Sequence, residues 1–336
     1  MTVCISQSYP RLWSLEDGIA MVVTDLHGDW DAYERYRDRF AHLHANGQAD
    51  YLIFTGNLIH AETPENDKSL EIILDILALR VTYGQAIIML CGNHEMPHIY
   101  NITLARGNHH YTPSFEEALS QSQWRTEVIN LFNSLPFYIR SQAGVSLTHA
   151  GAPPLFVEQA HALKLFNWNH QEMFDWAESL MAKDDIVLLR QGYSRLNQGL
   201  PYATLAEHFL AVSGPDDPRY DHLLRGFIAT SHPNFEGLLW PALFTRCEDE
   251  YGLADHRIFV DALLQALSLD FATQKCLVTG HINIKGGYQI VTSQHLRLAS
   301  ARHASPRQAG RYLLFDTGQP INNAKDLLNN LGSIYE

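Results

Sequence analysis

Five short apolar runs each end in a small polar cluster, and this recurrence is the feature that most constrains the fold. The runs cover residues 19–24, 51–55, 86–91, 145–148 and 276–279. Each run has the length and apolar character of a buried β-strand, and amphipathic helical patterns at 30–45 and 68–83 separate the first three. Strands that alternate with helices predict an α/β fold with helices on the faces of the sheet.

The polar clusters carry side chains that bind metals. In open α/β sheets, ligands bind at the carboxyl ends of the strands, so the five clusters are expected along one rim. Carboxylate, imidazole and amide groups suit hard or borderline divalent cations. The candidate ligands are Asp25, His27, Asn57, Asn93, His149 and His281. Five ligand-bearing turns, each closing an apolar run, together predict a metal centre.

Residues 153–240 differ from the rest of the chain because they are rich in aromatic side chains and helical patterns. The sequence there predicts helices over 163–176, 177–189 and 202–212, and a loop over 213–218. Strand character returns at 295–300 and 312–315. We expect a single domain over 1–336, with 153–240 as a helical insertion or cap.

Composition narrows the partners that we expect. A net charge of -13 argues against nucleic acid, whose binding needs a basic surface. The same charge permits phosphorylated substrates, because bound cations can reverse the local field. The chain has no signal-peptide pattern and no apolar stretch long enough to span a bilayer, so we expect no membrane partner and a cytoplasmic location. The four cysteines lie far apart, which argues against a disulfide framework or a zinc ribbon.

In order and spacing, the polar clusters resemble the motifs of the calcineurin-like metallophosphoesterases. The matching segments are Asp-Leu-His-Gly at 25–28, Gly-Asn at 56–57, Gly-Asn-His-Glu at 92–95, His-Ala-Gly at 149–151 and Gly-His at 280–281. The Gly-Asn-His-Glu form is typical of the phosphoprotein phosphatase branch, to which bacterial-type serine/threonine phosphatases belong. The resemblance covers residues 19–155 and 237–318 and implies a four-layer α-β-β-α sandwich.

The resemblance implies two divalent cations, of manganese, iron or zinc. Asp25 and His27 would hold the first cation, and Asn57 would occupy the bridging position. The ligands of the second cation would be completed by Asn93, His149 and His281. A hydroxide shared by the two cations would attack phosphorus in line, without a covalent enzyme intermediate.

The family pattern breaks at position 57, where the family normally has aspartate. A carboxylate can bridge two cations through two anionic oxygens, whereas an amide offers one neutral oxygen. Asn57 therefore predicts weakened binding of at least one metal and low activity. Either an aspartate has been replaced here or the chain is a naturally weak or inactive relative, and the intact remaining ligands favour the first explanation.

The resemblance also implies catalytic roles outside the metal ligands. His94 would be the general acid that protonates the leaving oxygen. The aspartate that normally orients this histidine is missing, because residues 58–62 read Leu-Ile-His-Ala-Glu where the family has Asp-Arg-Gly. His60 takes that place by spacing, and Asp67 is the alternative. Glu95 would orient a metal ligand from outside the metal centre.

The missing arginine of the same motif leaves the phosphate without its usual partner. Arg246 is the first candidate to replace it and Arg106 the second. The expected substrate is a phosphomonoester, either a phosphoprotein or a small phosphoester. One alternative is phosphoanhydride hydrolysis, as in dinucleoside tetraphosphatases, which Thr-His-Ala-Gly at 148–151 resembles. The other is a catalytically impaired module that binds phosphate or a partner.

Overall fold

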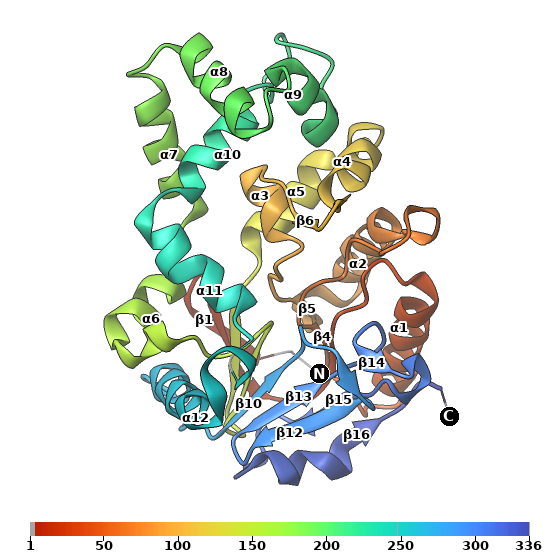
Figure 1. Ribbon diagram of the computed structural model, residues 1–336. Helices are drawn as coiled ribbons and strands as arrows, with labels where there is room; N and C mark the ends of the chain where they lie inside the picture. Colours follow the sequence, from red (N-terminus) through yellow and green to blue (C-terminus); the bar gives the residue numbers. More distant parts are fainter. Residues whose placement is uncertain (1–3, 247, 336) are drawn as a thin grey trace.

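Two β-sheets lie at the centre of the computed structural model, which describes residues 4–246 and 248–335 (Figure 1). The seven-stranded sheet has the order β1 (Cys4–Tyr9), β2 (Leu12–Asp17), β8 (Tyr138–Ser141), β9 (Val145–Thr148), β10 (Cys276–Thr279), β13 (His295–Leu298) and β12 (Tyr288–Thr292). The five-stranded sheet has the order β16 (Leu331–Gly332), β15 (Tyr312–Asp316), β3 (Ile19–Val23), β4 (Tyr51–Phe54) and β5 (Ile87–Met89). The seven strands expected from the sequence are confirmed, each end within two residues.

Alternating side chains of each strand enter different layers of the core. In β3, Ala20 and Val22 pack between the two sheets, whereas Met21 and Val23 pack on the opposite face, beneath helices. The same two-residue alternation holds in β4 and β5, so both faces of this sheet are buried. Strands buried on both faces are continuous apolar runs in the sequence, which is why these strands could be predicted.

Helices cover the two outer faces, which completes a four-layer α-β-β-α sandwich. On the five-stranded side lie α1 (Trp30–Ala45) and α2 (Ser69–Tyr83); on the seven-stranded side lie α6 (Gln159–Phe166) and α12 (Glu248–Leu267) (Figure 1). Asp29 begins α1 by accepting a hydrogen bond from the N–H of Ala32 (3.0 Å). The fold class expected from the sequence is confirmed.

The other helices gather at one end of the sandwich (Figure 1). They are α3 (Met96–Tyr100), α4 (Thr112–Ser120), α5 (Arg125–Ser134), α7 (His170–Met181), α8 (Ile186–Leu196), α9 (Tyr202–Leu210), α10 (His222–Thr230) and α11 (Trp240–Phe244). The helices predicted over 163–176 and 177–189 have wrong boundaries. Asn169 and Asp185 each cap a new helix instead, by accepting from the N–H two residues later. Among the described residues, no helix combines the length and apolar character that crossing a bilayer requires.

Candidate metal centre

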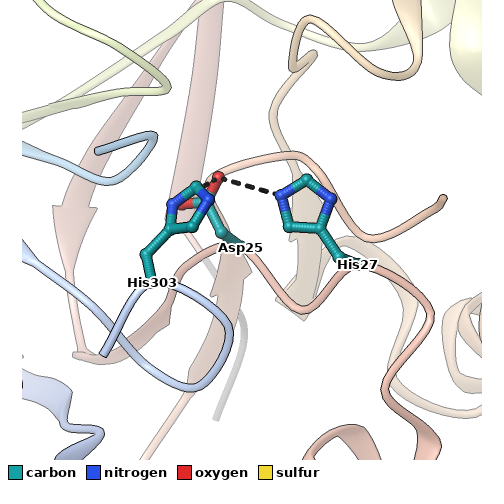
Figure 2. Close-up of side chains that lie close together, drawn as sticks. All are labelled: Asp25, His27 and His303. Carbon is teal, nitrogen blue, oxygen red and sulfur yellow. Dashed lines mark ion pairs between the residues drawn. The ribbon is translucent and has the colours of Figure 1, made fainter. Parts of the chain in front are cut away.

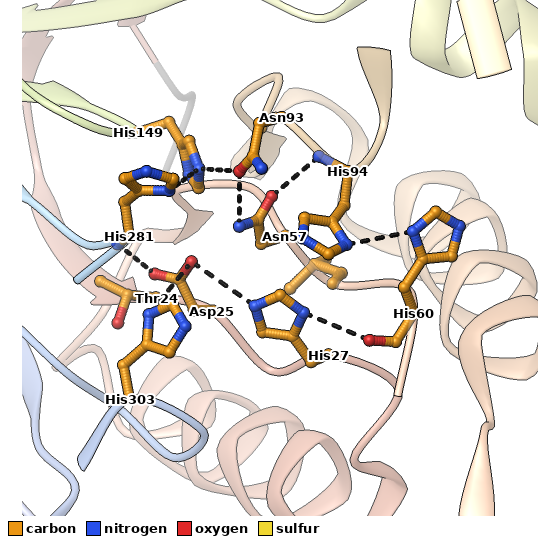
Figure 3. A network of polar contacts seen from close by, with 12 residues as sticks. Thr24, Asp25, His27, Asn57, His60, Asn93, His94, His149, His281 and His303 are labelled. Atoms are coloured by element: carbon orange, nitrogen blue, oxygen red, sulfur yellow. Dashed lines mark hydrogen bonds and ion pairs between the residues drawn. The ribbon is translucent and has the colours of Figure 1, made fainter. Parts of the chain in front are cut away.

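The turns that follow β3, β4, β5, β9 and β10 meet at one rim of the sandwich, and their side chains point toward one another (Figure 3). Hydrogen bonds hold the turns together. The N–H of His27 donates to the carbonyl of Asn57 (3.0 Å), and the N–H of His281 donates to Asp25 Oδ2 (2.8 Å). The structure thus brings together all six side chains that the sequence singled out as ligands.

Glu95 fixes the relative position of two of these turns. Its fully buried carboxylate accepts hydrogen bonds from the backbone N–H of Asn57 (2.9 Å), Leu58 (2.9 Å) and Gly92 (3.0 Å). Burial raises the pKa of Glu95, and these bonds oppose that shift. Glu95 thus joins the turn after β4 to the turn after β5 through backbone hydrogen bonds, and this geometry supports an orienting role.

Four residues of the rim adopt left-handed backbone conformations, which residues other than glycine rarely adopt. They are His27 (φ 49°), Asn57 (φ 55°), His60 (φ 70°) and His281 (φ 69°). Each such residue costs about 1–3 kcal/mol and persists only where the surrounding structure enforces it. Strain of this kind concentrates at functional sites, so its presence on three of the predicted ligands supports a shared chemical role.

Three unpaired polar atoms converge on one point of the rim (Figure 2). Asp25 Oδ1 lies 4.0 Å from His27 Nε2 and 3.6 Å from His303 Nδ1. Within the described part of the chain, these three buried atoms have no hydrogen-bond partner. The other nitrogen of His27, Nδ1, faces the carbonyl of His60 (3.3 Å), which can only accept, so a neutral His27 presents a bare lone pair to the carboxylate. A cation between the three atoms would give each of them a partner, and imidazole and carboxylate groups are ligands of divalent metals.

The protonation states of this cluster suit metal binding. Burial raises the pKa of Asp25 to about 8, while burial and then Arg302 lower the pKa of His27 to about 4. Burial also holds the pKa of His303 well below its usual value. The imidazoles are therefore neutral and able to coordinate, and Asp25 is the group that must lose a proton when a cation binds.

His303 was missed at the sequence level. It follows β13 in the short segment Ala-Ser-Ala-Arg-His at 299–303, so it repeats the pattern of an apolar run that ends in a polar cluster. The strand expected over 295–300 ends just before His303, so the expectation that ligands lie at the carboxyl ends of strands would have found it. The structure therefore adds His303 to the candidate ligands beside Asp25.

A second cluster lies next to the first. His149 Nε2 is 2.9 Å from Asn93 Oδ1 and 3.1 Å from His281 Nδ1 (Figure 3). His149 Nδ1 faces the carbonyl of Thr55 (2.9 Å) and so carries the hydrogen, which leaves Nε2 bare in the neutral ring. Burial and then His281 lower the pKa of His149 well below its usual value, so the ring is neutral. A lone pair opposite a carbonyl oxygen is again the arrangement that a cation would stabilise.

Asn57 lies between the two clusters with its amide nitrogen toward them. Its Oδ1 accepts from the backbone N–H of His94 (3.1 Å), which fixes the orientation of the amide. Its Nδ2 then donates to Asn93 Oδ1 (2.9 Å), the same oxygen that faces His149. An aspartate at position 57 would place a second anionic oxygen where this N–H₂ group lies.

His94 contacts only one of the two residues proposed to orient it. His94 Nδ1 lies 3.0 Å from His60 Nδ1 (Figure 3). Asp67 directs its carboxylate to Ser69 instead, where it accepts from the N–H (2.9 Å) and the hydroxyl at the start of α2. The geometry therefore favours His60 over Asp67 as the partner of His94.

A cavity of about 550 Å³ opens over both clusters. Its lining includes His94, both predicted arginines, Arg246 and Arg106, and a third arginine that the sequence did not single out, Arg302. Arg302 also pairs with Glu62 at the mouth. Guanidinium groups on the wall of a metal-lined cavity are suited to binding the oxygens of a phosphate.

Comparison with known proteins agrees with this chemistry. A profile of the calcineurin-like phosphoesterase family matches residues 20–216. A curated relative, the symmetrical bis(5'-nucleosyl)-tetraphosphatase of Nitrosococcus oceani, is 29% identical over 133 residues. The match covers 39% of this chain and 43% of the relative, so it spans less than half of that protein's length.

Solved structures with similar folds include two phosphatases. A protein serine/threonine phosphatase from Saccharomyces cerevisiae, similar to human phosphatase PP5, matches with a TM-score of 0.49 and 16% identity over 97% of this chain and 82% of its own. The cold-active protein-tyrosine phosphatase of a psychrophilic Shewanella species matches with a TM-score of 0.45 and 14% identity over 93% and 79%.

Proposed function

The chain belongs to the calcineurin-like phosphoesterase family, and we propose that its rim hydrolyses a phosphomonoester with the help of two divalent cations. The observation that supports this most is the pair of adjacent clusters in which buried imidazole nitrogens lie 2.9–4.0 Å from side-chain oxygens. A cation bound between such atoms would be coordinated by all of them and would stabilise polar groups that are buried away from water.

The first cation would be held by Asp25, His27 and His303, and the second by Asn93, His149 and His281. Asn57 occupies the position between them. When bound, such cations lower the pKa of water and so provide a nucleophile at neutral pH. Manganese, iron and zinc all suit this mixture of imidazole, carboxylate and amide ligands.

The remaining roles fall to residues around the cavity. His94 lines the cavity and would donate a proton from Nε2 to the leaving oxygen as the P–O bond breaks. Arg246, Arg106 and Arg302 would bind the phosphate oxygens and orient the ester. Their positive charge also offsets the acidity of the chain as a whole, which otherwise repels phosphorylated substrates.

A second candidate substrate is a dinucleoside polyphosphate. The relative from Nitrosococcus oceani favours it, since that protein is a symmetrical bis(5'-nucleosyl)-tetraphosphatase. Cleavage of a phosphoanhydride would use the same rim, because in both reactions the bond that breaks joins the attacked phosphorus to the leaving oxygen. The choice between the two depends on which group the cavity accepts beside the phosphate.

The orientation of Asn57 supports weakened metal binding. Its Nδ2–H₂ group faces the clusters, so Asp25 is the one anionic side chain among the seven proposed positions. Two dications beside a single carboxylate bind less tightly than two beside a pair of carboxylates. A catalytically impaired protein that binds phosphate without hydrolysing it is therefore the third candidate.

The test compares the unaltered chain with Asn57→Asp on three substrates: para-nitrophenyl phosphate, a phosphoserine peptide and a dinucleoside tetraphosphate. The added carboxylate should raise metal affinity by at least about tenfold, which corresponds to about 1.4 kcal/mol, and turnover should rise with it. Metal content is measured in parallel by elemental analysis. Asn169→Asp is the matched control. It adds the same charge at the start of α7, where an aspartate can cap the helix as Asn169 does.

Each result assigns one of the candidates. Turnover of the monoesters alone supports a phosphatase, and turnover of the tetraphosphate alone supports the second candidate. Bound metal without turnover of any substrate, even in Asn57→Asp, supports the impaired binding protein. Equal metal content and equal turnover in both chains would show that position 57 does not weaken the site.

A further inference from the structure

Three buried histidines and a carboxylate form a continuous hydrogen-bonded chain that leads from the cavity into the protein. His94 Nδ1 lies 3.0 Å from His60 Nδ1, and His60 Nε2 lies 2.8 Å from His98 Nε2. His98 Nδ1 lies 2.7 Å from Glu116 Oε1. Each of the four side chains is at least nine-tenths buried, so water does not compete for these bonds.

The inner end of this chain is an ionised carboxylate. Arg125 Nη2 donates to Glu116 Oε2 (2.6 Å), while the other oxygen of Glu116 faces His98. Burial raises the pKa of Glu116, but the bonds from His98 and Arg125 outweigh it, so the pKa lies below its usual value. An ionised carboxylate accepts hydrogen bonds and cannot donate them.

An ionised carboxylate at this end sets the direction of every bond when the three imidazoles are neutral. His98 Nδ1 must donate to Glu116, and when His98 carries this one hydrogen its Nε2 accepts. His60 Nε2 then donates to His98, and His60 Nδ1 accepts in turn. His94 Nδ1 is left as the donor to His60, and the remaining nitrogen of His94, Nε2, lies on the opposite edge of a ring that lines the cavity.

We propose that His60, His98 and Glu116 are positioning residues that keep a hydrogen on His94 Nδ1 and direct His94 Nε2 to the leaving group. This rests on the proposed function, in which His94 is the general acid. When Nε2 also carries a hydrogen, the doubly protonated ring still donates from Nδ1 to His60 without conflict. As the P–O bond breaks, its electron pair stays on the leaving oxygen; the Nε2–H bond also breaks, and its proton forms an O–H bond with that oxygen. His94 returns to its Nδ1–H form, and no other bond of the chain changes.

Aromatic rings hold the chain in place. Tyr111 stacks on the ring of His60 with 5.9 Å between centroids and 20° between planes. Phe115 packs edge-on against both His60 and His98, at 5.9 Å and 4.7 Å. These contacts restrict rotation of the imidazoles, so the hydrogen-bond direction set at Glu116 reaches His94.

Glu116→Gln should reverse the chain with almost no change in shape. Arg125 has only donors and would bind the amide oxygen, which turns the amide N–H₂ toward His98 Nδ1. His98 would then donate from Nε2, His60 from Nδ1, and His94 would carry its hydrogen on Nε2. Protonating His94 at Nδ1 would now bring two N–H groups face to face with His60, so the acid form is disfavoured.

The test is the ¹⁵N NMR spectrum of the imidazoles in the full chain, recorded with zinc, whose filled d shell leaves the signals sharp. In the unaltered chain we expect hydrogen on Nδ1 of His94, Nε2 of His60 and Nδ1 of His98. In Glu116→Gln all three assignments should exchange. A hydrogen on His94 Nε2 in the unaltered chain would overturn the proposal, and this reading needs no variant to fold.

Kinetics supply the second reading. In the Asn57→Asp background, Glu116→Gln should lower kcat at least about tenfold for an alkyl phosphate, whose leaving oxygen needs the proton. It should change kcat little for para-nitrophenyl phosphate, and leave KM unchanged for both. Equal losses on both esters would contradict a role through His94.

His170→Gln is the matched control. His170 is also a buried histidine, with Nδ1 2.9 Å from the hydroxyl of Tyr100, but it is not joined to the chain. We expect it to lower thermal stability and to leave both the His94 signals and the leaving-group dependence unchanged. If no phosphate ester is hydrolysed yet the NMR assignments hold, the proposed function fails and the positioning chain stands.

Discussion

At the scale of single residues, the rim is governed by where hydrogens can lie. His27 and His149 each face a backbone carbonyl through Nδ1, so their Nε2 atoms face the side-chain oxygens Asp25 Oδ1 and Asn93 Oδ1 respectively. Asn57 is fixed in the opposite sense, because its N–H₂ donates to Asn93 Oδ1. Metal binding at this rim is therefore linked to protons mainly through one carboxyl group.

That group is Asp25, and its pKa predicts how metal affinity depends on pH. Its pKa of about 8 lies above its usual value of 3.8, so the protonated form stabilises the metal-free fold, and this stabilisation is lost as pH rises toward about 8. The pKa values of His27 and His281, about 4 and about 3, make both rings neutral well below pH 6. Cation binding near pH 6.5 should therefore release about one proton, and affinity should rise up to about tenfold per pH unit and level off above about 8.

Calorimetric titration with manganese in two buffers of different ionisation heat measures the released proton. Asp25→Asn is the control, because it keeps the shape of the side chain and removes the proton that is released. An affinity that does not change between pH 6 and pH 8 would contradict the assignment of Asp25 as the titrating ligand.

Residues with a fixed place beside a strand could be predicted from the sequence, and residues that join the site through the fold could not. Asp25 and Asn93 follow apolar runs directly, so local pattern located them. His98 and Glu116 lie in helices where nothing local distinguishes them from ordinary polar residues. The positioning role that we propose for them depends on α3 and α4, which place His98 Nδ1 and Glu116 Oε1 2.7 Å apart.

At the scale of elements, the ends of β3 and β10 approach closely because Gly280 has no side chain. A Cβ added at Gly280 would lie 2.1 Å from Asp25 Oδ2 and 2.9 Å from Thr24 Cβ. These strands belong to different sheets, so Gly280 lies where the two sheets approach each other at the rim. The position of Asp25 therefore depends on how the sheets pack.

Gly280→Ala should displace Asp25 and weaken the first metal cluster. Overpacking of this kind typically costs about 1–3 kcal/mol of stability, and we expect metal affinity to fall at least about tenfold in the same calorimetric titration. Gly192→Ala is the control, since that glycine lies within α8 and a Cβ there meets nothing within 4 Å. It should stabilise by up to about 1 kcal/mol, and metal affinity should not change. An unchanged affinity in Gly280→Ala would mean that Asp25 does not depend on this contact.

The elements that sequence reasoning located best are those with continuous apolar runs. β3, β4, β9 and β10 are buried on both faces and bounded by polar turns. β1 and β2 were not predicted, because β1 is partly exposed and β2 ends in two exposed acidic residues, so neither forms a continuous apolar run. In residues 153–240 the helix breaks depend on single caps such as Asn169, which an apolar pattern does not reveal.

At the scale of the whole molecule, we propose that residues 1–336 work as one domain in which 153–240 form a helical insertion. Part of the insertion has its own small core, built around Tyr202, Leu205 and Leu223. Within the described residues, the lining of the cavity comes from segments such as 104–106 and 281–283 and includes none of 153–240. The insertion therefore stands beside the cavity, with α9 packed on α4.

The most direct measurement is anomalous X-ray scattering from crystals of the full chain grown with manganese. We predict a peak bound by Asp25, His27 and His303, and a second, weaker peak bound by Asn93, His149 and His281 that strengthens in Asn57→Asp. Manganese bound elsewhere, or at neither cluster in both chains, would contradict the assignment of this rim as a metal centre.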